Sequence, residues 1–410
     1  AGRPIGLLFD LQGPKLRLAA DTETRALAVD DTVVFCGDHG TSEDRVVVDF
    51  AGFAGLVTER SEIVIGDGVP RLSVDSVQEG EVVARVRSAG PLSARKGINV
   101  TWARPELPAI TDKDVDDLAL AAELGADFVA LSFVRSASDL EQLRARLLAH
   151  GSEARIVAKI EKVEAYEHLD EIIAVTDGVM VARGDYGVEA GVAHVPLMQK
   201  DTILRATQAG KLVITATQML ESMIQAPEPT RAEAADVANA VIDGTSAVML
   251  SAETSVGAYP VAAVRAMAEI ATAAERAPVI HGRASSADGE TAAGAVMHAA
   301  VMLADEVDAA ALVVPTSTGG AARACAKYRR PRPILALAYE ERAANQLTLE
   351  WGVHPSAVPV AETVDEMIDA ALVAARDHAG LPSGARVIVT AGRQTGTPGG
   401  TNLIMVREIP

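Results

Sequence analysis

The sequence predicts an α/β protein in three parts: a parallel sheet built from repeated βα units, an all-β domain inserted near its start, and a second α/β domain. A length of 410 residues exceeds what one ordinary core can hold, so several domains are expected. Hydrophobic residues make up 49% of the chain but aromatics only 3%, so Ala, Val, Leu and Ile must pack the core, which suits strand–helix layers. Between residues 100 and 255, β-branched runs alternate with segments of helical period, which is typical of βα units.

Six apolar runs are expected to form the strands of the first sheet. Each is hydrophobic on both faces, as the strands of a buried parallel sheet are. They are GLLFD (6–10), FVALSF (128–133), RIVAKI (155–160), GVMVARG (178–184), KLVITAT (211–217) and AVMLS (247–251). Helices separate most of them: Thr111 with Asp114, and Thr230 with Glu233, have the spacing of a helix N-terminus.

The other two domains are expected on either side of these units. Residues 17–95 hold short alternating pieces with turn residues between them and no convincing helix, which indicates an inserted all-β domain. A second α/β alternation begins near residue 283, after the linker-like SSADGE. Its expected strands are ALVVPT, PILALA, RVIVTAG and TNLIMVRE, and its expected helices lie near 291–306, 320–329, 341–351 and 363–379. The first α/β domain then comprises residues 1–16 and 96–282.

Charge and cysteine content exclude several classes of protein. With 37 Lys and Arg against 56 Asp and Glu, the net charge of -19 repels nucleic acid and anionic membrane surfaces. Two distant cysteines, Cys36 and Cys325, suggest neither a disulfide framework nor a thiolate metal site. The eight histidines form no zinc-spaced cluster, and no run approaches the roughly 18 uncharged residues of a membrane helix. We expect a soluble cytoplasmic protein.

Polar residues recur where the apolar runs of the first sheet end. In a (β/α)₈ barrel the carboxyl ends of the strands converge on one face, so these side chains are expected to share a pocket. Any one of them alone is more often a turn or cap residue, but six coincident strand ends favour a site. The residues are Asp10, Ser132, Lys159, Glu161, Asp185, Thr217, Ser251 and Glu253.

Three of these residues suggest phosphoryl chemistry. Lys159 and Glu161 lie two apart, so on a strand their side chains point the same way. A second carboxylate from the next strand, Asp185, could share a hard cation such as Mg²⁺ with Glu161. An ammonium beside them could neutralise a transferring phosphoryl group, although a plain Lys159–Glu161 salt bridge is the alternative. Gly184 and Gly187 free the backbone where a helix is expected to begin, and its N–H groups could hold a carboxylate or phosphate.

Several segments closely resemble pyruvate kinases. They are IVAKIE, GVMVARGDYGVE, LVITATQMLESMI, PTRAEAADVANAVIDGTSAVMLSAET and KGINV, and the similarity runs from GLLFDLQGPKLR through the C-terminal domain. The resemblance implies a catalytic (β/α)₈ barrel interrupted by a small β lid domain and followed by an α/β regulatory domain. It also implies transfer of a phosphoryl group from phosphoenolpyruvate to ADP, giving pyruvate and ATP, by a homotetramer.

The resemblance further implies a role for each matching residue. Glu161 and Asp185 would bind Mg²⁺ or Mn²⁺, Lys159 would stabilise the phosphoryl group in flight, and Thr217 would lie where the enolate is protonated. The backbone of Gly184 and Asp185 would bind the substrate carboxylate. Ser132, Thr217, Ser251 and Glu253 would line the substrate pocket, with Arg17, Lys96 and Asp67 on the nucleotide side and Arg17 also catalytic.

DLQGPKLRL resembles the potassium-independent members of the family. Members that need potassium commonly have Thr, Lys, Glu and Thr at the positions of Leu11, Gln12, Lys15 and Leu18. The Lys15 ammonium could supply the charge that a monovalent cation provides, which predicts activity without potassium. The alternative is that Lys15 simply pairs with Asp10.

Two features depart from the family pattern. Six strands precede the C-terminal domain whereas barrel closure takes eight, and the family's first two strands precede the segment that starts here, so we expect a fragment or a barrel completed in another way. In TSTGGAARA, residues Thr316, Ser317, Thr318 and Gly319 form a loop suited to an effector phosphate. Gly320 and Ala321 stand where the family commonly has Arg and Ser, and an ordinary Thr-capped turn is the alternative.

Two other functions remain open at this point. A metal-dependent lyase or aldolase also holds a pyruvate enolate with Glu and Asp ligands on such a barrel. The inserted β domain and the Lys159–Glu161 spacing argue against it. A catalytically silent barrel remnant, kept as a binding subunit, is the second alternative.

Overall fold

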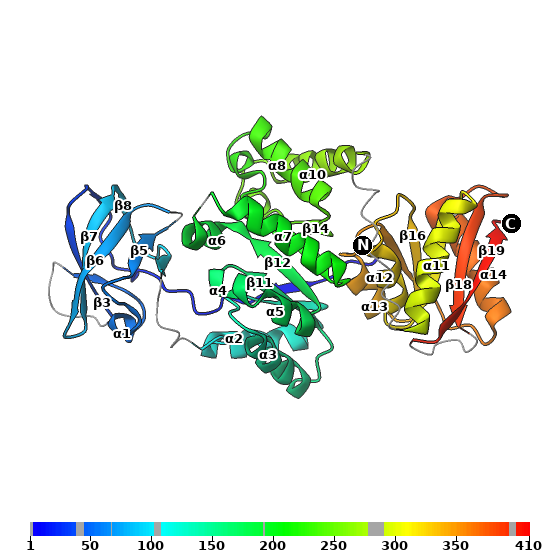
Figure 1. Cartoon of the computed structure of the whole chain (residues 1–410), viewed down its shortest axis with the longest axis horizontal. Helices are drawn as coiled ribbons and strands as arrows, with labels where there is room; N and C mark the ends of the chain where they lie inside the picture. Colours follow the sequence, from blue (N-terminus) through cyan, green and yellow to red (C-terminus); the bar gives the residue numbers. More distant parts are fainter. Residues whose placement is uncertain are drawn as a thin grey trace.

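The computed structural model describes residues 3–37, 45–66, 68–101, 108–191, 193–277, 291–392 and 399–410. Figure 1 shows three parts in a row, with the inserted β domain and the C-terminal domain at opposite ends of the central sheet and its helices. The predicted linker SSADGE and Asp67 lie outside the described residues.

The central part contains the predicted parallel sheet. Its order is β1-β10-β11-β12-β13-β14, and every neighbouring pair is parallel. The strands are β1 (Leu8–Asp10), β10 (Phe128–Leu131), β11 (Arg155–Ile160), β12 (Gly178–Ala182), β13 (Leu212–Ala216) and β14 (Ala247–Val248). All six predicted strands are confirmed, although β14 keeps only two of its five predicted residues.

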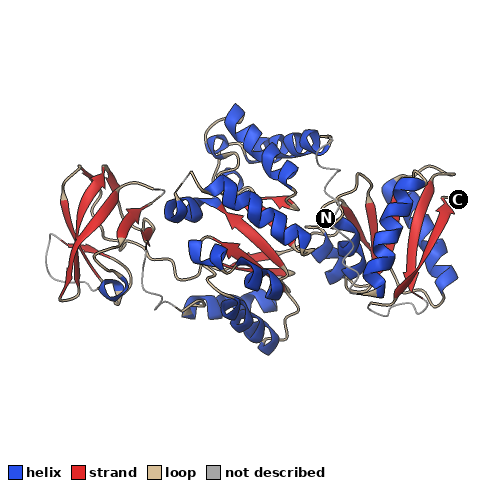
Figure 2. Cartoon of the chain, in the orientation of Figure 1, coloured by secondary structure: helices blue, strands red, loops and turns tan. Residues whose placement is uncertain are grey.

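Helices pack against this curled sheet, as Figure 2 shows. They are α2 (Asp112–Glu123), α3 (Ala137–Ala149), α4 (Val163–Glu167), α5 (Leu169–Val175), α6 (Arg183–Ala190), α7 (Val195–Gln208), η1 (Glu221–Ile224), α8 (Arg231–Asp243), α9 (Ala252–Ser255) and α10 (Pro260–Glu275). Both predicted helix starts are confirmed as capping boxes, at Thr111 with Asp114 and at Thr230 with Glu233. Alternate residues of the strands enter two different apolar clusters, so both faces of the sheet are covered.

Strands β10, β12, β13 and β14 end earlier than predicted, and the early end of β12 affects the site. GVMVARG was predicted as strand through Gly184, but β12 ends at Ala182, and Arg183 and Gly184 are the first residues of α6. The chain leaves the sheet at its carboxyl edge here, and the helix begins directly after the strand. Asp185 is therefore presented by the first turn of α6 instead of by the strand itself.

The inserted domain is built almost entirely of strands around a separate core. Its sheets have the orders β2-β8 and β4-β3-β7-β6-β5-β9. The elements are β2 (Arg25–Leu27), β3 (Thr32–Cys36), β4 (Arg45–Val47), α1 (Phe53–Leu56), β5 (Glu62–Ile65), β6 (Arg71–Gln78), β7 (Glu81–Ser88), β8 (Gly90–Leu92) and β9 (Ile98–Val100). The four-residue helix α1, which the sequence reading missed, places Phe53 in this core 6.2 Å from the ring of Phe35.

The C-terminal domain has its own mixed sheet, in the order β17-β16-β15-β18-β19. Its elements are α11 (Ala292–Glu306), β15 (Ala311–Thr316), α12 (Gly320–Ala326), β16 (Ile334–Ala338), α13 (Glu341–Leu347), β17 (Val353–Ala357), α14 (Val364–Ala379), β18 (Arg386–Gly392) and β19 (Thr401–Glu408). The four predicted strands and four predicted helices are present. Strand β17 was missed because VHPSA has few apolar residues, and its Pro355 is tolerated at the sheet edge.

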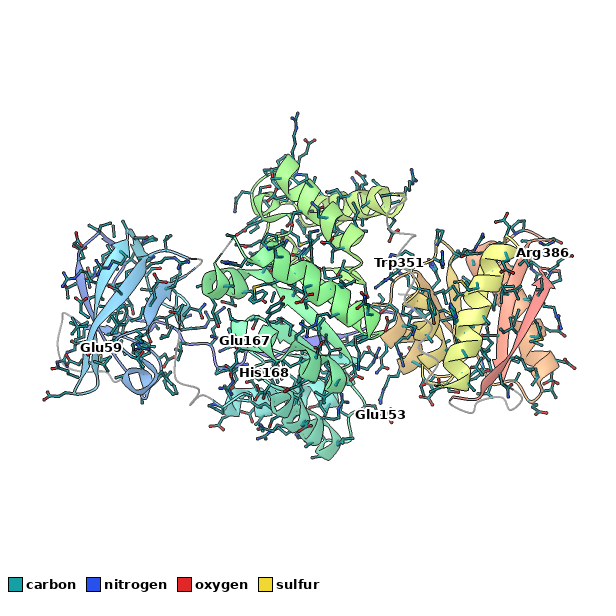
Figure 3. The ribbon with its side chains drawn as sticks, viewed as in Figure 1. Glu59, Glu153, Glu167, His168, Trp351 and Arg386 are labelled. Atoms are coloured by element: carbon teal, nitrogen blue, oxygen red, sulfur yellow. The ribbon has the colours of Figure 1, made fainter. Side chains whose placement is uncertain are left out.

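Side chains join the central part to the C-terminal domain. Arg155 of β11 lies 3.1 Å from the carboxylate of Glu350, and Trp351 donates a hydrogen bond to Glu275 at 3.0 Å. Figure 3 shows Trp351 and Glu153 on this side of the central part. Within the described ranges, no helix is both long and apolar enough to cross a membrane.

Candidate active site

Lys159 lies at the centre of the group of polar residues at the strand ends. Its ammonium is 3.0 Å from Asp10, 2.8 Å from the hydroxyl of Ser132 and 3.3 Å from Glu161, which end β1 or directly follow β10 and β11. Burial acts to lower the pKa of Lys159, but the charges of Glu161 and Asp10 outweigh it, and the pKa lies above its ordinary value. The site therefore holds a fixed positive charge.

Glu161 is a deeply buried carboxylate, with 3% of its side chain exposed. One oxygen faces Lys159, and the other accepts a hydrogen bond from the backbone N–H of Phe133 at 2.8 Å. Burial raises the pKa of Glu161, Lys159 lowers it, and the nearby charge of Asp185 raises it again, with a net rise. The two carboxylates are thus close enough to repel each other.

Asp185 lies beside Glu161 on the more exposed side of the site. Its oxygens are 3.4 Å from the ammonium of Lys15 and 3.4 Å from the side-chain nitrogen of Asn99. Asn99 belongs to β9 of the inserted domain, and we did not predict it. It stands in the KGINV segment, but a residue outside the barrel strands gives no pattern that would point to this contact.

Lys15 does not form the ion pair with Asp10 that was the alternative in the sequence analysis. Lys15 pairs with Asp185, while Asp10 pairs with Lys159. The Lys15 ammonium also lies 6.0 Å from the centre of the Phe133 ring. The positive charge contributed by DLQGPKLRL therefore faces one of the two predicted metal ligands.

Thr217 follows β13 and contacts the start of α6. Its hydroxyl accepts a hydrogen bond from the backbone N–H of Gly184 at 2.9 Å. Both Thr217 and Gly184 were predicted site residues, and the structure brings them together. Gly184, which donates this hydrogen bond, is the residue directly before Asp185.

Glu253 accepts hydrogen bonds from backbone groups, including that of Ser251. Glu253 is 2% exposed and accepts hydrogen bonds from the backbone N–H groups of Ser251 at 2.7 Å and Leu220 at 3.1 Å. These contacts tie the start of α9 to the segment before η1. Ser251 has a buried hydroxyl without a hydrogen-bond partner. Their role in lining the substrate pocket stays a prediction.

A cavity of about 850 Å³ opens between the inserted domain and the central part. Its lining includes Lys15, Arg17, Lys96, Asn99 and Asp185, which places the two predicted nucleotide-side residues that are described next to one predicted metal ligand. Glu167, at the barrel wall of this cavity, lies on the side that faces the β domain (Figure 3). Asp67 falls outside the described residues.

The cavity lining has a net positive charge, opposite in sign to that of the whole protein. Eight basic side chains line it against five acidic ones, whereas the chain carries a net charge of -19. The basic residues are Lys15, Arg17, Arg60, Arg71, Arg95, Lys96, Arg135 and Lys162, and the acidic ones are Glu62, Glu164, Glu167, Asp185 and Glu189. Such a local excess of positive charge suits an anionic ligand such as a polyphosphate.

The predicted effector loop lines a second cavity, of about 220 Å³, in the C-terminal domain. Thr316, Ser317 and Thr318 contribute to it together with Gly320. The hydroxyl of Thr316 also accepts a hydrogen bond from the N–H of Gly319 at 3.0 Å, as in the capped-turn alternative. The hydrogen bond is that of the capped-turn alternative, and the effector site stays a prediction.

The donor set fits a hard divalent cation that completes its shell with substrate oxygens. In the part of the chain that the structure describes, no group of three or more His, Cys, Asp or Glu side chains could hold a metal. Mg²⁺ is commonly held by one or two carboxylates plus phosphate oxygens and waters, so the pair Glu161 and Asp185 is sufficient. The mutual repulsion that raises the pKa of Glu161 is what a cation between the two would relieve.

Comparison with known proteins gives the family. Residues 1–264 match the model "Pyruvate kinase, barrel domain", and residues 294–407 match "Pyruvate kinase, alpha/beta domain". The chain is 40% identical over 418 residues to a pyruvate kinase of Geobacillus stearothermophilus, covering 100% of this chain and 71% of that protein. It is 40% identical over 415 residues to one from Mycobacterium tuberculosis (strain ATCC 25618 / H37Rv), covering 100% and 87% respectively.

A third relative is more distant, and it carries the same name. The pyruvate kinase of Clostridium perfringens is 36% identical over 413 residues, covering 98% of this chain and 87% of that protein. These comparisons give no support to the lyase alternative. The chain belongs to the pyruvate kinase family, and it is a phosphotransferase that converts phosphoenolpyruvate and ADP into pyruvate and ATP in glycolysis.

Proposed function

We propose that this reaction takes place where β1, β10, β11 and α6 meet, with Glu161 and Asp185 as the ligands of Mg²⁺ and with Mn²⁺ as its substitute. The observation that carries the proposal is the position of Lys159, whose ammonium lies within 3.3 Å of Glu161 and is held by Asp10 and Ser132. When bound, the cation would neutralise phosphoryl charge. Lys159 would add a second, fixed positive charge on the same side.

Each remaining residue would bind or orient a part of the substrates. The N-cap residue of α6, Ala182, makes no side-chain cap, and the N–H of Gly184 already donates to Thr217, so the substrate carboxylate would bind at the backbone beside that hydrogen bond, around Gly184 and Asp185. Ser132, Ser251 and Glu253 would line the substrate pocket. Thr217 would stand at the face of the enolate where a proton is added. The hydrogen bond from Gly184 to Thr217 supports this, because it joins the proton-bearing hydroxyl to the carboxylate-binding turn.

The large cavity would hold the nucleotide. Arg17 and Lys96 line it and could contact ADP phosphates, and Asp67 is carried over from the family motif alone. Arg17 would also reach the transferring phosphoryl group. Closure of the inserted domain over the cavity would exclude water, which otherwise competes for that group.

A coupled assay tests the proposed reaction directly. Pyruvate released from phosphoenolpyruvate and ADP is reduced by lactate dehydrogenase, and the loss of NADH absorbance gives the rate. We expect activity that requires both ADP and a divalent cation. Pyruvate formed without equimolar ATP would contradict the proposal, and an inactive, fully folded protein would favour the silent-remnant alternative.

We predict that the enzyme needs no potassium, because Lys15 already places a cation 3.4 Å from Asp185. Activity should be the same in potassium and in tetramethylammonium buffers. Lys15→Met should lower kcat/KM by about tenfold, because it removes the positive charge beside Asp185 that a potassium ion would otherwise have to supply. A steep rise of wild-type activity with added potassium would contradict this.

We predict that Mg²⁺ stabilises the protein more at neutral than at acidic pH. The pKa of Glu161 is raised by burial and by Asp185, so the folded state holds the proton more tightly than the unfolded state does. Glu161 therefore favours folding at low pH and costs stability once the pH rises through its folded pKa. A cation that binds the ionised form offsets this cost. The Mg²⁺-induced rise in Tm should be larger at about pH 8 than at about pH 5, and equal rises would contradict it.

The resemblance also supports proposals on assembly, regulation and location. We propose a homotetramer, and the exposed apolar side chains Val256, Val261 and Val264 near α9 and α10 provide surface for subunit contacts. Light scattering should give a mass of four chains. We further propose a phosphorylated effector at the loop formed by Thr316, Ser317, Thr318 and Gly319, and a cytoplasmic location.

A further inference from the structure

The turn after β13 has an unusual backbone. Thr217 has a φ of 63° and Gln218 a φ of 54°, so two consecutive L-residues lie in the left-handed region. This region favours glycine, and Thr217 is β-branched, which makes its conformation a true outlier. Neighbouring groups must hold such a turn in place.

Arg183 provides the groups that hold it. Its guanidinium donates to the carbonyl of Thr217 from Nη2 at 2.7 Å and from Nε at 3.2 Å, and to the carbonyl of Gln218 at 3.0 Å. Its Nη1 forms an ion pair with Asp236 of α8. The side chain is 8% exposed and is absent from the lining of the large cavity. Arg183 thus contacts the turn at Thr217 and Gln218, and Asp236 holds its side chain in place.

A further hydrogen bond reaches the same threonine from the residue that follows Arg183. The next residue, Gly184, donates its backbone N–H to the hydroxyl of Thr217 at 2.9 Å. Residues 183 and 184 therefore hold Thr217 at its carbonyl and at its hydroxyl. Asp185 follows directly, so the hydroxyl and the carboxylate are fixed in one rigid unit.

We propose that Arg183 is a positioning residue that sets the Thr217 hydroxyl against the enolate and thereby controls its protonation. In that step the Thr217 O–H bond breaks as its proton passes to C3 of the enolate, the C2 oxygen becomes the carbonyl of pyruvate, and the hydroxyl regains a proton from water, with no change in oxidation state. The proposal rests on the role proposed for Thr217. It assigns to Arg183 an effect on proton transfer and none on the binding of ADP.

Exchange of the pyruvate methyl protons in D₂O, followed by ¹H NMR with Mg²⁺ and ATP present, isolates the proton-transfer step. We expect Arg183→Met to slow this exchange by about 100-fold, the loss that a displacement near 1 Å can cause, with KM for ADP unchanged. Arg183→Lys should be impaired too, because an ammonium cannot serve both carbonyls as the planar guanidinium does. Arg205→Met, which removes another carboxylate-paired guanidinium away from the site, should exchange normally.

A double-variant cycle separates positioning from general loss of structure. If Arg183 acts through Thr217, then Arg183→Met adds no further loss to Thr217→Ala. The proposal would be overturned if the double variant exchanged more slowly than Thr217→Ala by the factor that Arg183→Met shows alone. A normal exchange rate in Arg183→Met would also overturn it. If Arg183→Met does not fold, Asp236→Asn serves instead, because it removes the ion pair with Arg183. It should slow the exchange in the same way but by less. Normal exchange in Asp236→Asn would overturn the proposal. Normal exchange in Thr217→Ala alone would instead overturn the role of Thr217, and the proposal with it.

Discussion

Replacing Lys159 with methionine is expected to lower kcat by about 10³-fold, the scale at which a preorganised charge at a transferring phosphoryl group contributes. The ammonium is held by Asp10, Ser132 and Glu161 before any substrate binds, so no reorganisation is needed as the transition state forms. The coupled assay measures this loss. Lys159→Arg should keep part of the activity, because it keeps the charge without the compact geometry of the ammonium.

Loss of structure has to be separated from loss of catalysis in this variant. Removing one partner of a buried ion pair can cost about 3–5 kcal/mol, and Glu161 would be left without Lys159. Thermal unfolding of Lys159→Met should therefore be measured alongside its kcat. Lys211→Met is the matched control, because it also removes a partly buried ammonium, one that donates to the carbonyl of Thr176 at 2.7 Å outside the site. Wild-type kcat in a folded Lys159→Met protein would contradict the role of Lys159.

Glu161→Gln is expected to lower kcat/KM by at least about 100-fold. Loss of a residue that only hydrogen-bonds to a metal ligand already costs about 10- to 100-fold, and loss of the ligand itself should cost more. Glutamine can still accept the hydrogen bond from Phe133, so the local fold should be kept. It removes one of two negative charges, however, and with it the preference for a divalent cation. Raising the Mg²⁺ concentration should restore part of the activity, as expected if the metal is bound more weakly. Activity that is lost equally at all Mg²⁺ concentrations would argue against a ligand role.

Glu253→Gln is the matched control for this prediction. Glu253 is as deeply buried as Glu161, but it accepts hydrogen bonds from the backbone of Ser251 and Leu220. Its loss should lower the Tm, and its Mg²⁺ dependence should be that of the wild type. Equal Mg²⁺ dependence in the two variants would show that burial alone explains the Glu161 effect.

The cluster around Lys159 could be predicted from sequence because of a regularity in parallel sheets. Strands β1, β10 and β11 end at the same edge, so Asp10, Ser132 and Glu161 necessarily come close to one another. The capping boxes were equally predictable, since they depend on residues three apart in the chain.

Other contacts could not be predicted because they depend on long-range placement. Asn99 reaches Asp185 from the inserted domain, and nothing local in KGINV encodes where that domain will lie. Arg183 was expected to belong to a strand, but it begins α6, and its side chain contacts the carbonyl groups after β13. That outcome requires the position of Asp236 on α8, which lies 53 residues further along the chain.

Binding of Mn²⁺ followed by electron paramagnetic resonance tests the central claim most directly, namely that Glu161 and Asp185 hold one divalent cation beside Lys159. The wild type should bind one Mn²⁺ per chain in competition with Mg²⁺, and Glu161→Gln and Asp185→Asn should each lose most of that affinity. Unchanged Mn²⁺ binding in both variants, with the protein folded, would contradict the account.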